Sequence, residues 1–385
     1  MARESAVLGV VADGFEPVRD EFAAVAASEG ADYAAQMVAY RRGECVVDLW
    51  TGPGIGGDSL LGAYSASKGA AHLVVARLVQ DGVLDLDRRV ADYWPEFAVH
   101  GKGEIPLRDL LAHRAGLTGA DSGFTLEELA DDQAIAERLG AQQPYWRPGV
   151  AFGYHALVAA ALSGEVVRRA TGVSVQELFA ERIRDRYAVD FHFGLPDDLE
   201  SRFLPTLPAV MTPERRAESA AQATAPDSLS GIAFNRNNPH GPQVWELPNL
   251  EVIRKQGPAS LGGIASARGL ARMYAAAIGP LNTAAPLLNP RTLAAFGQIQ
   301  SIGSDLVARS RKAFTPGFHA TSEYYPALGQ GSFGHSGAGG QQAFADPRNG
   351  VAFGYTRRLF PFPAGPGRDC ERLIAVIYHA VNALR

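Results

Sequence analysis

A serine and a lysine stand one helical turn apart at the start of an apolar segment of this chain. Ser65 and Lys68 precede a stripe that includes Leu73 and Leu78, so their spacing predicts that both side chains lie on one side of a helix. The N-terminal end of that helix would favour negative charge, and the free serine N–H could stabilise an oxyanion. A desolvated lysine would lose its charge and could accept the serine proton. The alternative is a capping serine beside a solvated lysine, and the pair alone does not decide between the two.

Two more segments carry residues that can take part in such chemistry. Residues 146–149 lead to Tyr154 at the expected start of another helix, where a tyrosine is more often a packed aromatic than a catalyst. The glycine-rich run 334–340 precedes the last predicted hairpin, and glycines at a strand edge let a substrate approach the backbone. The alternative for this run is a tight entry into a strand.

Sequence patterns for other chemistries are missing. The glycines of residues 52–57 match a dinucleotide-binding pattern, but Pro53 and the lack of a following strand–helix–strand unit argue against it. No serine has glycines at both second neighbours, which excludes the nucleophile elbow of α/β-hydrolases. The chain has no C-x-x-C and its nine histidines form no H-E-x-x-H, so we expect neither a metal nor a cofactor.

The periodicity of apolar residues predicts helices and strands at both ends of the chain. The expected elements are a helix over residues 15–28, a hairpin of strands 37–40 and 45–50, a second hairpin of strands 342–345 and 351–355, and a final helix with an apolar stripe from Cys370 to Leu384. We therefore predict a single antiparallel sheet that is built from both ends and flanked by the terminal helices.

The middle of the chain is predicted to be mostly helical. Helices are expected around Leu73, from Leu157 to Gly172 and from Val175 to Ile183, whereas residues 200–258 show weak periodicity and are expected to be irregular.

These elements suggest two domains. We expect a discontinuous sheet domain of residues 1–64 and 255–385 and a helical domain of residues 65–254. The active site would then lie in the cleft between them.

Composition indicates a folded protein and gives no sign of a charged macromolecular partner. Hydrophobic residues make up 46% of the chain and charged residues 20%, and a net charge of -5 gives no reason to expect binding to nucleic acid or to an anionic membrane. Cys45 and Cys370 fall in apolar segments and are expected to be buried free thiols. We expect a soluble, cytoplasmic protein that does not bind membranes, and the sequence leaves its oligomeric state open.

Taken together, these segments resemble the class C β-lactamases and, more closely, the family VIII carboxylesterases, over nearly the whole chain. The segments that carry the resemblance are residues 64–69, 84–87, 93–97, 110–117, 146–154 and 335–337. The first contains S-x-x-K, and the last stands where β-lactamases carry K-T-G. The resemblance implies an α+β fold of the β-lactamase/transpeptidase type.

The resemblance also implies roles for individual residues. Ser65 would be the nucleophile and Lys68 its activating partner, while Tyr154 would share the work of the base and then protonate the leaving group. The backbone N–H groups of Ser65 and Ala338 would form the oxyanion hole. Which of Lys68 and Tyr154 takes the proton first stays open, because coupled groups titrate as a unit. The substrate-binding residues would be Trp146, His155, His335, Ser336 and Gly337.

Two departures from the β-lactamase pattern bear on the substrate. Ala156 stands where the Y-x-N box has its amide, and His335 replaces the lysine of K-T-G. Losing two polar substrate contacts costs selectivity, so we expect hydrolysis of small carboxylic esters through an acyl-enzyme on Ser65. The alternatives are an acyltransferase on the same scaffold, an amidase or D-peptidase, an inefficient β-lactamase and, from a different class, a non-catalytic binding module.

Overall fold

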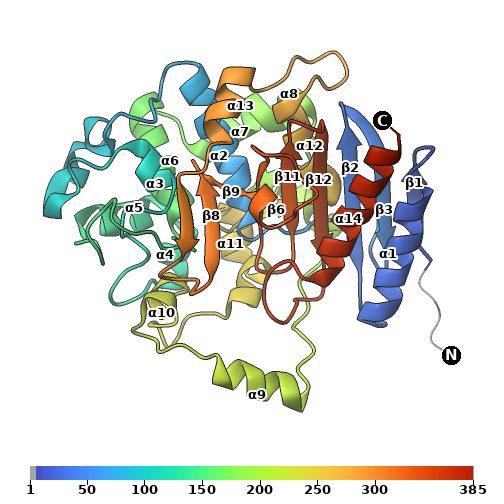
Figure 1. Ribbon diagram of the computed structural model, residues 1–385. Coiled ribbons are helices and arrows are strands. Elements are labelled where there is room, and N and C mark those ends of the chain that lie inside the picture. The colour runs from blue at the N-terminus through green and yellow to red at the C-terminus, as the bar shows by residue number, and fades with distance from the viewer. Residues whose placement is uncertain (1–5, 385) are drawn as a thin grey trace.

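The main element of the fold is one large antiparallel sheet. The computed structural model describes residues 6–384. The strands of the large sheet are β1 (Leu8–Val11), β2 (Ala35–Arg41), β3 (Glu44–Thr51), β7 (Ser301–Ser304), β8 (Arg311–Thr315), β9 (Phe318–Ala320), β10 (Phe333–Ser336), β11 (Gln342–Asp346) and β12 (Val351–Arg357). They lie in the order β1-β3-β2-β12-β11-β10-β9-β8-β7, so strands from the two ends of the chain meet where β2 pairs with β12 (Figure 1). The predicted α+β fold with an antiparallel sheet is confirmed; residues 1–5 and 385, which the expected sheet domain includes, lie outside the described residues.

Both faces of this sheet are buried at its central strands β2, β12 and β11, whose successive side chains point to opposite sides. In β2, Met37 packs with the terminal helices α1 (Glu16–Glu29) and α14 (Arg368–Ala383), while Val38 faces the other core. Figure 1 shows α1 and α14 side by side across one face of the strands. The two terminal helices expected from the sequence therefore cover the sheet as predicted.

Small residues bring a helix unusually close to the opposite face of the sheet. Helix α12 (Ala267–Ile278) packs on β12, where a Cβ built on Gly354 would come within 2.5 Å of the Ala267 oxygen and the Ala271 nitrogen. The backbones approach this closely only because Gly354 has no side chain.

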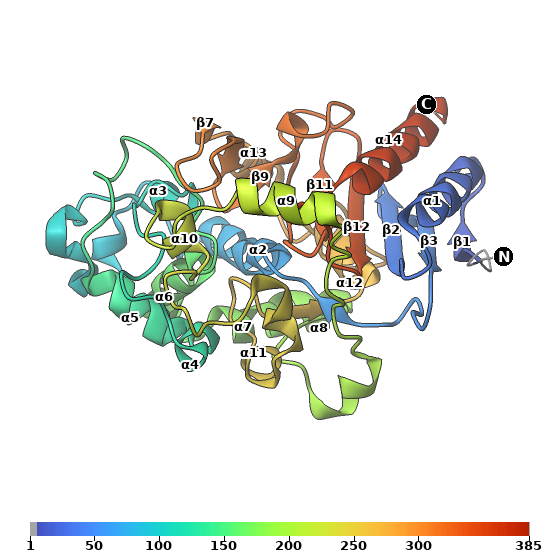
Figure 2. The same cartoon turned by 90° about the horizontal axis from the view of Figure 1, so that it is seen from below.

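Helix α2 (Ala66–Gln80) lies at the centre of the molecule, between the sheet and the helices at its far end (Figure 2). Twelve of its fifteen residues are buried, as expected of a helix that contacts the fold on all sides. It contacts β10 and β11 on one side and α6 (Ala159–Thr171) and α7 (Val175–Phe179) on the other. The polar side chains of Ser67, Lys68 and His72, in the first half of this helix, are therefore removed from water.

A second, three-stranded sheet fixes the chain just before α2. It consists of β4 (Leu61–Gly62), β6 (Gly263–Ala265) and β5 (Phe191–Phe193), with β6 in the middle. The Ala63 N–H donates to the Gly263 carbonyl at 2.8 Å. Strands of two or three residues leave no periodic pattern, so the sequence analysis missed this sheet, as it missed β1 and β7–β10.

The remaining helices are short. They are α3 (Leu107–Leu111), α4 (Leu126–Ala130), α5 (Asp132–Ala141), α8 (Asp185–Tyr187), α9 (Pro213–Ala221), α10 (Leu229–Ala233), α11 (Glu251–Gln256) and α13 (Pro290–Phe296). The expectation that residues 200–258 are irregular is wrong in part, because α9, α10 and α11 form there. Side-chain caps from Thr212 and Ser228 start the first two, and α9 has no buried residue that would give an apolar stripe.

The two cysteines differ in environment. Cys370 is buried in α14 as expected, but Cys45 is exposed, which corrects the prediction for that residue. Cys45 lies next to the turn of the β2–β3 hairpin, where the pairing shifts between Ala39 and Tyr40 and interrupts the alternation of buried and exposed positions.

No helix within residues 6–384 combines the length and the apolar character that crossing a membrane requires. The cytoplasmic location expected from the sequence stays a prediction.

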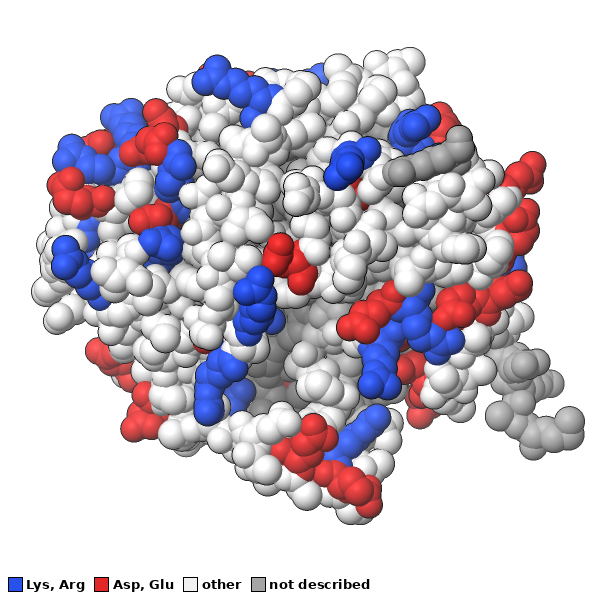
Figure 3. All heavy atoms as spheres, viewed as in Figure 1, with Lys and Arg blue, Asp and Glu red and all other residues white. Residues whose placement is uncertain are grey.

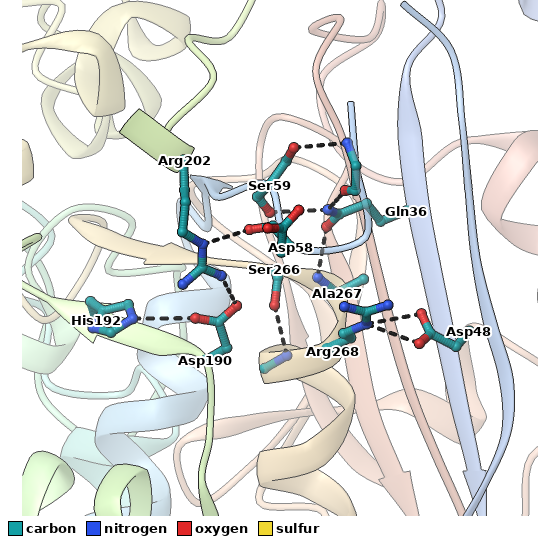
Figure 4. A network of polar contacts seen from close by, with 12 residues as sticks. Gln36, Asp48, Asp58, Ser59, Asp190, His192, Arg202, Ser266, Ala267 and Arg268 are labelled. Carbon is teal, nitrogen blue, oxygen red and sulfur yellow. Dashed lines mark hydrogen bonds and ion pairs between the residues drawn. The ribbon is translucent and has the colours of Figure 1, made fainter. Parts of the chain in front are cut away.

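A polar network joins the loop before β4 to the sheet and to α12 (Figure 4). The Gln36 amide donates to the Gly56 and Ser59 carbonyls, and its oxygen accepts from the Ala267 N–H at 2.9 Å. Nearby, Arg202 donates to Asp190 at 2.5 Å and to the Asp58 carbonyl at 2.8 Å. The loop that leads to α2 is thus fixed by buried hydrogen bonds as well as by strand pairing.

The Asp190 carboxylate of this network makes the free energy of unfolding depend on pH in the acid range. Burial by itself raises the pKa of Asp190, but hydrogen bonds from His192, Arg202 and Ser266 outweigh it and lower that pKa to about 2. Its stabilisation is therefore complete above the unfolded-state pKa near 4 and disappears as the pH falls through about 2. We expect Asp190→Asn to lower the free energy of unfolding at pH 7 by on the order of 2 kcal/mol. Urea titrations should show this difference shrink between pH 4 and pH 2, and a constant difference over that range would contradict the assignment.

Candidate active site

Ser65 and Lys68 face each other across the first turn of α2. Ser65 is the N-cap of the helix, and Lys68 Nζ lies 3.1 Å from Ser65 Oγ. The preceding residue, Tyr64, has a φ of 49°, a left-handed conformation that is costly for a bulky side chain. Its hydroxyl donates to the Trp245 carbonyl at 2.8 Å, and this contact helps to hold the turn that places Ser65 at the helix start.

The Lys68 amine is enclosed by backbone carbonyls. The residue is 0% exposed, and Nζ donates to the carbonyls of Ala156 at 2.5 Å and Ser260 at 2.8 Å. Burial lowers the pKa of Lys68 well below its usual value, and the charge of Asp132 opposes this only in part. No carboxylate among the described residues forms an ion pair with it. In its neutral form this amine, with two N–H groups on carbonyls, would direct its lone pair at Ser65 Oγ, the geometry that a general base requires.

Tyr154 reaches the same point from a loop. Helix α6 begins only at Ala159, more than one helical turn after Tyr154, so the expectation that Tyr154 starts a helix is wrong. Its N–H donates to Asp305 Oδ1 at 3.1 Å and its ring stacks on Phe314 with centroids 6.0 Å apart. Burial raises the pKa of the hydroxyl, and its hydrogen bond with Ser65 lowers it by less. Lys68 Nζ lies 5.3 Å from the centre of this ring. One serine thus contacts both titratable groups.

Two buried histidines hold the loop that carries Tyr154. The His155 N–H donates to His113 Nδ1 at 3.2 Å, and the His113 carbonyl accepts from Gly153 N–H at 3.0 Å. His155 is 0% exposed, with Nδ1 on the Gly153 carbonyl at 2.7 Å and Nε2 accepting from Leu117 N–H at 3.1 Å. His155 therefore does not reach the ligand side of the site, contrary to the substrate-binding role expected for it, and it acts within the scaffold.

The glycine-rich turn after β10 lies against the start of α2. A Cβ on Gly337 would come within 2.6 Å of the Ala63 oxygen, and one on Gly339 within 2.6 Å of the Tyr64 ring. The N–H groups of Ser65 and Ala338 have no backbone acceptor within residues 6–384. Two free N–H groups on adjoining segments can bind one oxyanion.

The imidazole that replaces the β-lactamase lysine is uncharged. Burial lowers the pKa of His335 well below its usual value, and the nearby His319 and Lys68 add to this. Its Nδ1 bonds to the Ser336 carbonyl at 2.9 Å, while Nε2 is buried with no partner in the described part of the chain. The ring stacks on His319 at 4.3 Å between centroids. Both imidazoles are uncharged, and their centroids lie 6.1 Å (His335) and 6.2 Å (His319) from the centroid of the Tyr154 ring.

Two other predicted substrate residues are partly exposed. Trp146 donates its Nε1–H to the Ala151 carbonyl at 3.2 Å and packs edge-on against His155. Ser336 ends β10 beside the glycine turn. The space-filling view shows a hollow in this face of the molecule above α9, and acidic and basic side chains are interspersed over the face without a large patch of either sign (Figure 3).

The sequence analysis missed several residues of the site. One is Ser260, whose carbonyl binds Lys68, and another is Asp305, which binds the loop that carries Tyr154. A third is His319, which stacks on His335. No sequence motif marks any of them. His113 lies within the matched segment 110–117 and could have been singled out there. Despite the gathering of histidines, the described residues contain no group of three or more His, Cys, Asp or Glu side chains placed to hold a metal ion.

Comparison with known proteins gives consistent matches. The model of the family described as Beta-lactamase matches residues 22–375. The esterase/beta-lactamase LipL of Mycobacterium tuberculosis is 30% identical over 360 residues, which cover 84% of this chain and 77% of LipL. The structure of EstA from Arthrobacter nitroguajacolicus Rue61a is 39% identical, with a TM-score of 0.90, and covers 97% of this chain and 98% of its own. A family VIII carboxylesterase structure is 31% identical, with a TM-score of 0.86, and covers 97% and 99%.

The geometry predicts selective reactivity of Ser65. A fluorophosphonate probe should label the wild-type protein at Ser65, and Ser65→Ala should not be labelled. Removing the base in Lys68→Met should slow labelling by roughly 100-fold or more. Ser67→Ala is the matched control, because Ser67 is a buried serine of the same helix whose Oγ accepts from the Gly263 N–H at 2.9 Å. Labelling of Ser65→Ala at the wild-type rate would remove Ser65 from the role of nucleophile.

Proposed function

The chain belongs to the beta-lactamase family, and from this we propose that it is a serine carboxylesterase that cleaves small esters through an acyl-enzyme on Ser65. The observation that carries the proposal is the desolvated Lys68 amine, 3.1 Å from Ser65 Oγ and held by two carbonyls. Relatives and structural neighbours that are named esterase or carboxylesterase support it.

The proposed reaction starts with proton transfer from Ser65. The Oγ–H proton passes to the Lys68–Tyr154 pair as Oγ attacks the ester carbonyl carbon. The negative charge that develops on the carbonyl oxygen is stabilised by the N–H groups of Ser65 and Ala338. The C–O bond to the alcohol then breaks, the pair returns its proton to the departing alcohol, and the acyl group stays on Ser65. Water, activated by the same pair, releases the acid and restores the serine.

The surroundings of the site favour esters over β-lactams. The Ala156 side chain is buried and offers no amide, and its carbonyl is already occupied by Lys68. His335 is neutral, so it cannot balance the carboxylate of a β-lactam. A short ester needs neither contact, because the oxyanion hole and an apolar acyl pocket suffice.

Acyl transfer is the second candidate, since its chemistry is shared until deacylation. An alcohol or amine would replace water as the acceptor of the acyl group. Turnover of a p-nitrophenyl ester with and without added alcohols, with analysis of the products, separates the two: a transferase makes mostly the new ester, and an esterase makes mostly acid. An amidase or D-peptidase would cleave p-nitroanilides in the same assay.

The proposed base predicts an acid limb in the pH–rate profile. Because burial lowers the pKa of Lys68, the amine should be neutral at working pH, and activity should fall in acid as Lys68 gains its proton. Lys68→Arg should lose roughly 100-fold or more in kcat, since a guanidinium does not give up its charge. Thermal denaturation of the variant serves as the control for folding. Wild-type activity in a folded Lys68→Arg protein would rule out Lys68 as base.

The substrate class predicts a preference that one preparation can test. We expect clear turnover of acetyl to butyryl p-nitrophenyl esters and slow turnover of nitrocefin. Two missing buried contacts of about 1 to 3 kcal/mol each imply roughly a hundredfold or more in kcat/KM relative to a true β-lactamase. Measured values of kcat/KM for nitrocefin and p-nitrophenyl butyrate decide the question. If nitrocefin is the better substrate, the ester proposal is wrong.

A further inference from the structure

A buried carboxylate from another helix reaches the backbone that holds Lys68. Asp132 is the first residue of α5, and its Oδ2 accepts from the Ala259 N–H at 2.9 Å and from Gln176 Nε2 at 2.7 Å. Its Oδ1 is buried and has no hydrogen-bond partner among residues 6–384. A carboxylate with two donors on one oxygen and none on the other is fixed in place while most of its charge is uncompensated.

Contacts lead from this carboxylate to the amine of Lys68. Ala259 precedes Ser260, whose carbonyl accepts from Lys68 Nζ at 2.8 Å. The Ser260 Oγ accepts from the Ala160 N–H at 2.9 Å, so the same residue is also tied to the start of α6. The direction of the Ser260 carbonyl therefore depends on a backbone that Asp132 anchors.

The charges around Lys68 leave Asp132 as the acid that acts on it. The imidazoles that face Lys68 from its own helix and from the other side of the site are neutral, because burial lowers the pKa of each one. These residues are His72, His113, His319 and His335. Tyr154, whose pKa is raised by burial, is neutral as well. Among residues 6–384, Asp132 is the carboxylate whose charge opposes the effect of desolvation on the pKa of Lys68.

Asp132 has charged neighbours of its own. Burial raises its pKa to about 6, the neighbouring Asp131 acts in the same direction, and the hydrogen bonds from Ala259 and Gln176 oppose this. A cavity of about 550 Å³ lies beside it. The ionisable side chains that line this cavity with Asp132 are Glu127, Asp131, Glu165 and Arg168. Of these, Glu165 is paired with Arg168 and Arg169, so its charge is already compensated.

We propose that Asp132 is a positioning residue for the catalytic lysine: it anchors the backbone at Ala259 so that the Ser260 carbonyl holds Lys68, and its negative charge favours the protonated form of that amine. The inference rests on the proposed function, in which neutral Lys68 is the base. Asp132 touches neither the substrate nor Ser65, and it acts through Ser260 and through its field.

The test is the pH profile of kcat/KM for p-nitrophenyl butyrate in the full-length protein. Asp132→Asn keeps an oxygen that can accept from the Ala259 N–H but removes the negative charge. The protonated form of Lys68 is then less stabilised, and its pKa should fall. The acid limb should shift to lower pH by roughly half to one unit, with kcat at the optimum reduced only a few-fold. Asp132→Ala also removes the anchor, and its kcat should fall on the order of tenfold.

The matched control is Asp131→Asn, which removes an adjacent exposed charge while an asparagine can still cap α5. It should leave the acid limb in place. Gln176→Ala is the second variant should Asp132→Asn fail to fold. It removes a donor from the carboxylate, favours its protonation and should shift the limb in the same direction by less.

An acid limb of Asp132→Asn that superimposes on the wild type, or one that moves to higher pH, would overturn the inference. An Asp131→Asn shift equal to that of Asp132→Asn would also overturn it, since the effect would then be one of general charge. Lys68→Met run in parallel separates this from failure of the proposed function. If Lys68→Met stays active, the proposed base is wrong; if it is inactive and the Asp132→Asn profile is unchanged, only the role of Asp132 is wrong.

Discussion

The desolvation of a single ammonium group constrains much of this structure. Lys68 lies on a helix that is buried on all sides, and a charged amine there would cost several kcal/mol without an ion pair. The fold provides two backbone carbonyls instead, from Ala156 and Ser260, which satisfy a neutral amine. Those carbonyls belong to the loop before α6 and the loop before β6, so three distant segments must converge before the serine has a base. The candidate site therefore exists only in the completed fold.

Glycines, which have no side chain, allow these segments to approach one another closely. A Cβ on Gly69 of α2 would lie 2.2 Å from the Tyr274 hydroxyl of α12, and Gly337 and Gly354 allow similarly close approaches elsewhere. At each of these positions an added Cβ would meet an atom at a distance that real contacts do not show. Gly69 thus allows α2 to pack closely against Tyr274 of α12, and Gly337 allows the glycine-rich turn to lie against the chain just before α2. Burial, opposed in part by the charge of Asp132, lowers the pKa of Lys68, on whose protonation state the chemistry depends.

The sequence predicted those features that local pattern encodes. The terminal helices, the hairpins at both ends, and the Ser65–Lys68 spacing follow from periodicity, and the structure brings this pair within 3.1 Å. The short strands β4 and β8 carry too little pattern to be predicted. Ser260, Asp132 and Asp305 act through hydrogen bonds to segments that are distant in the chain, and nothing in their neighbouring residues marks them. His155 shows the opposite error, because a residue next to a functional tyrosine was expected to face the ligand, whereas its ring is used within the fold.

The imidazoles near Tyr154 explain what kind of charge the site is prepared to meet. Burial lowers the pKa of His155 to about 4 and that of His319 to about 3, and the pKa values of His113 and His335 are also well below normal. At neutral pH these four rings are polar but uncharged, and burial lowers the pKa of Lys68 by the same cause. No fixed cation at His335 awaits a carboxylate on the substrate. What the geometry does offer is a pair of free N–H groups for an oxygen that becomes negative only when Ser65 attacks. Such a site gains most from a neutral substrate whose charge appears in the transition state, since interactions made only there lower the barrier. A small neutral ester meets that condition, whereas a β-lactam brings an anion that nothing at His335 compensates.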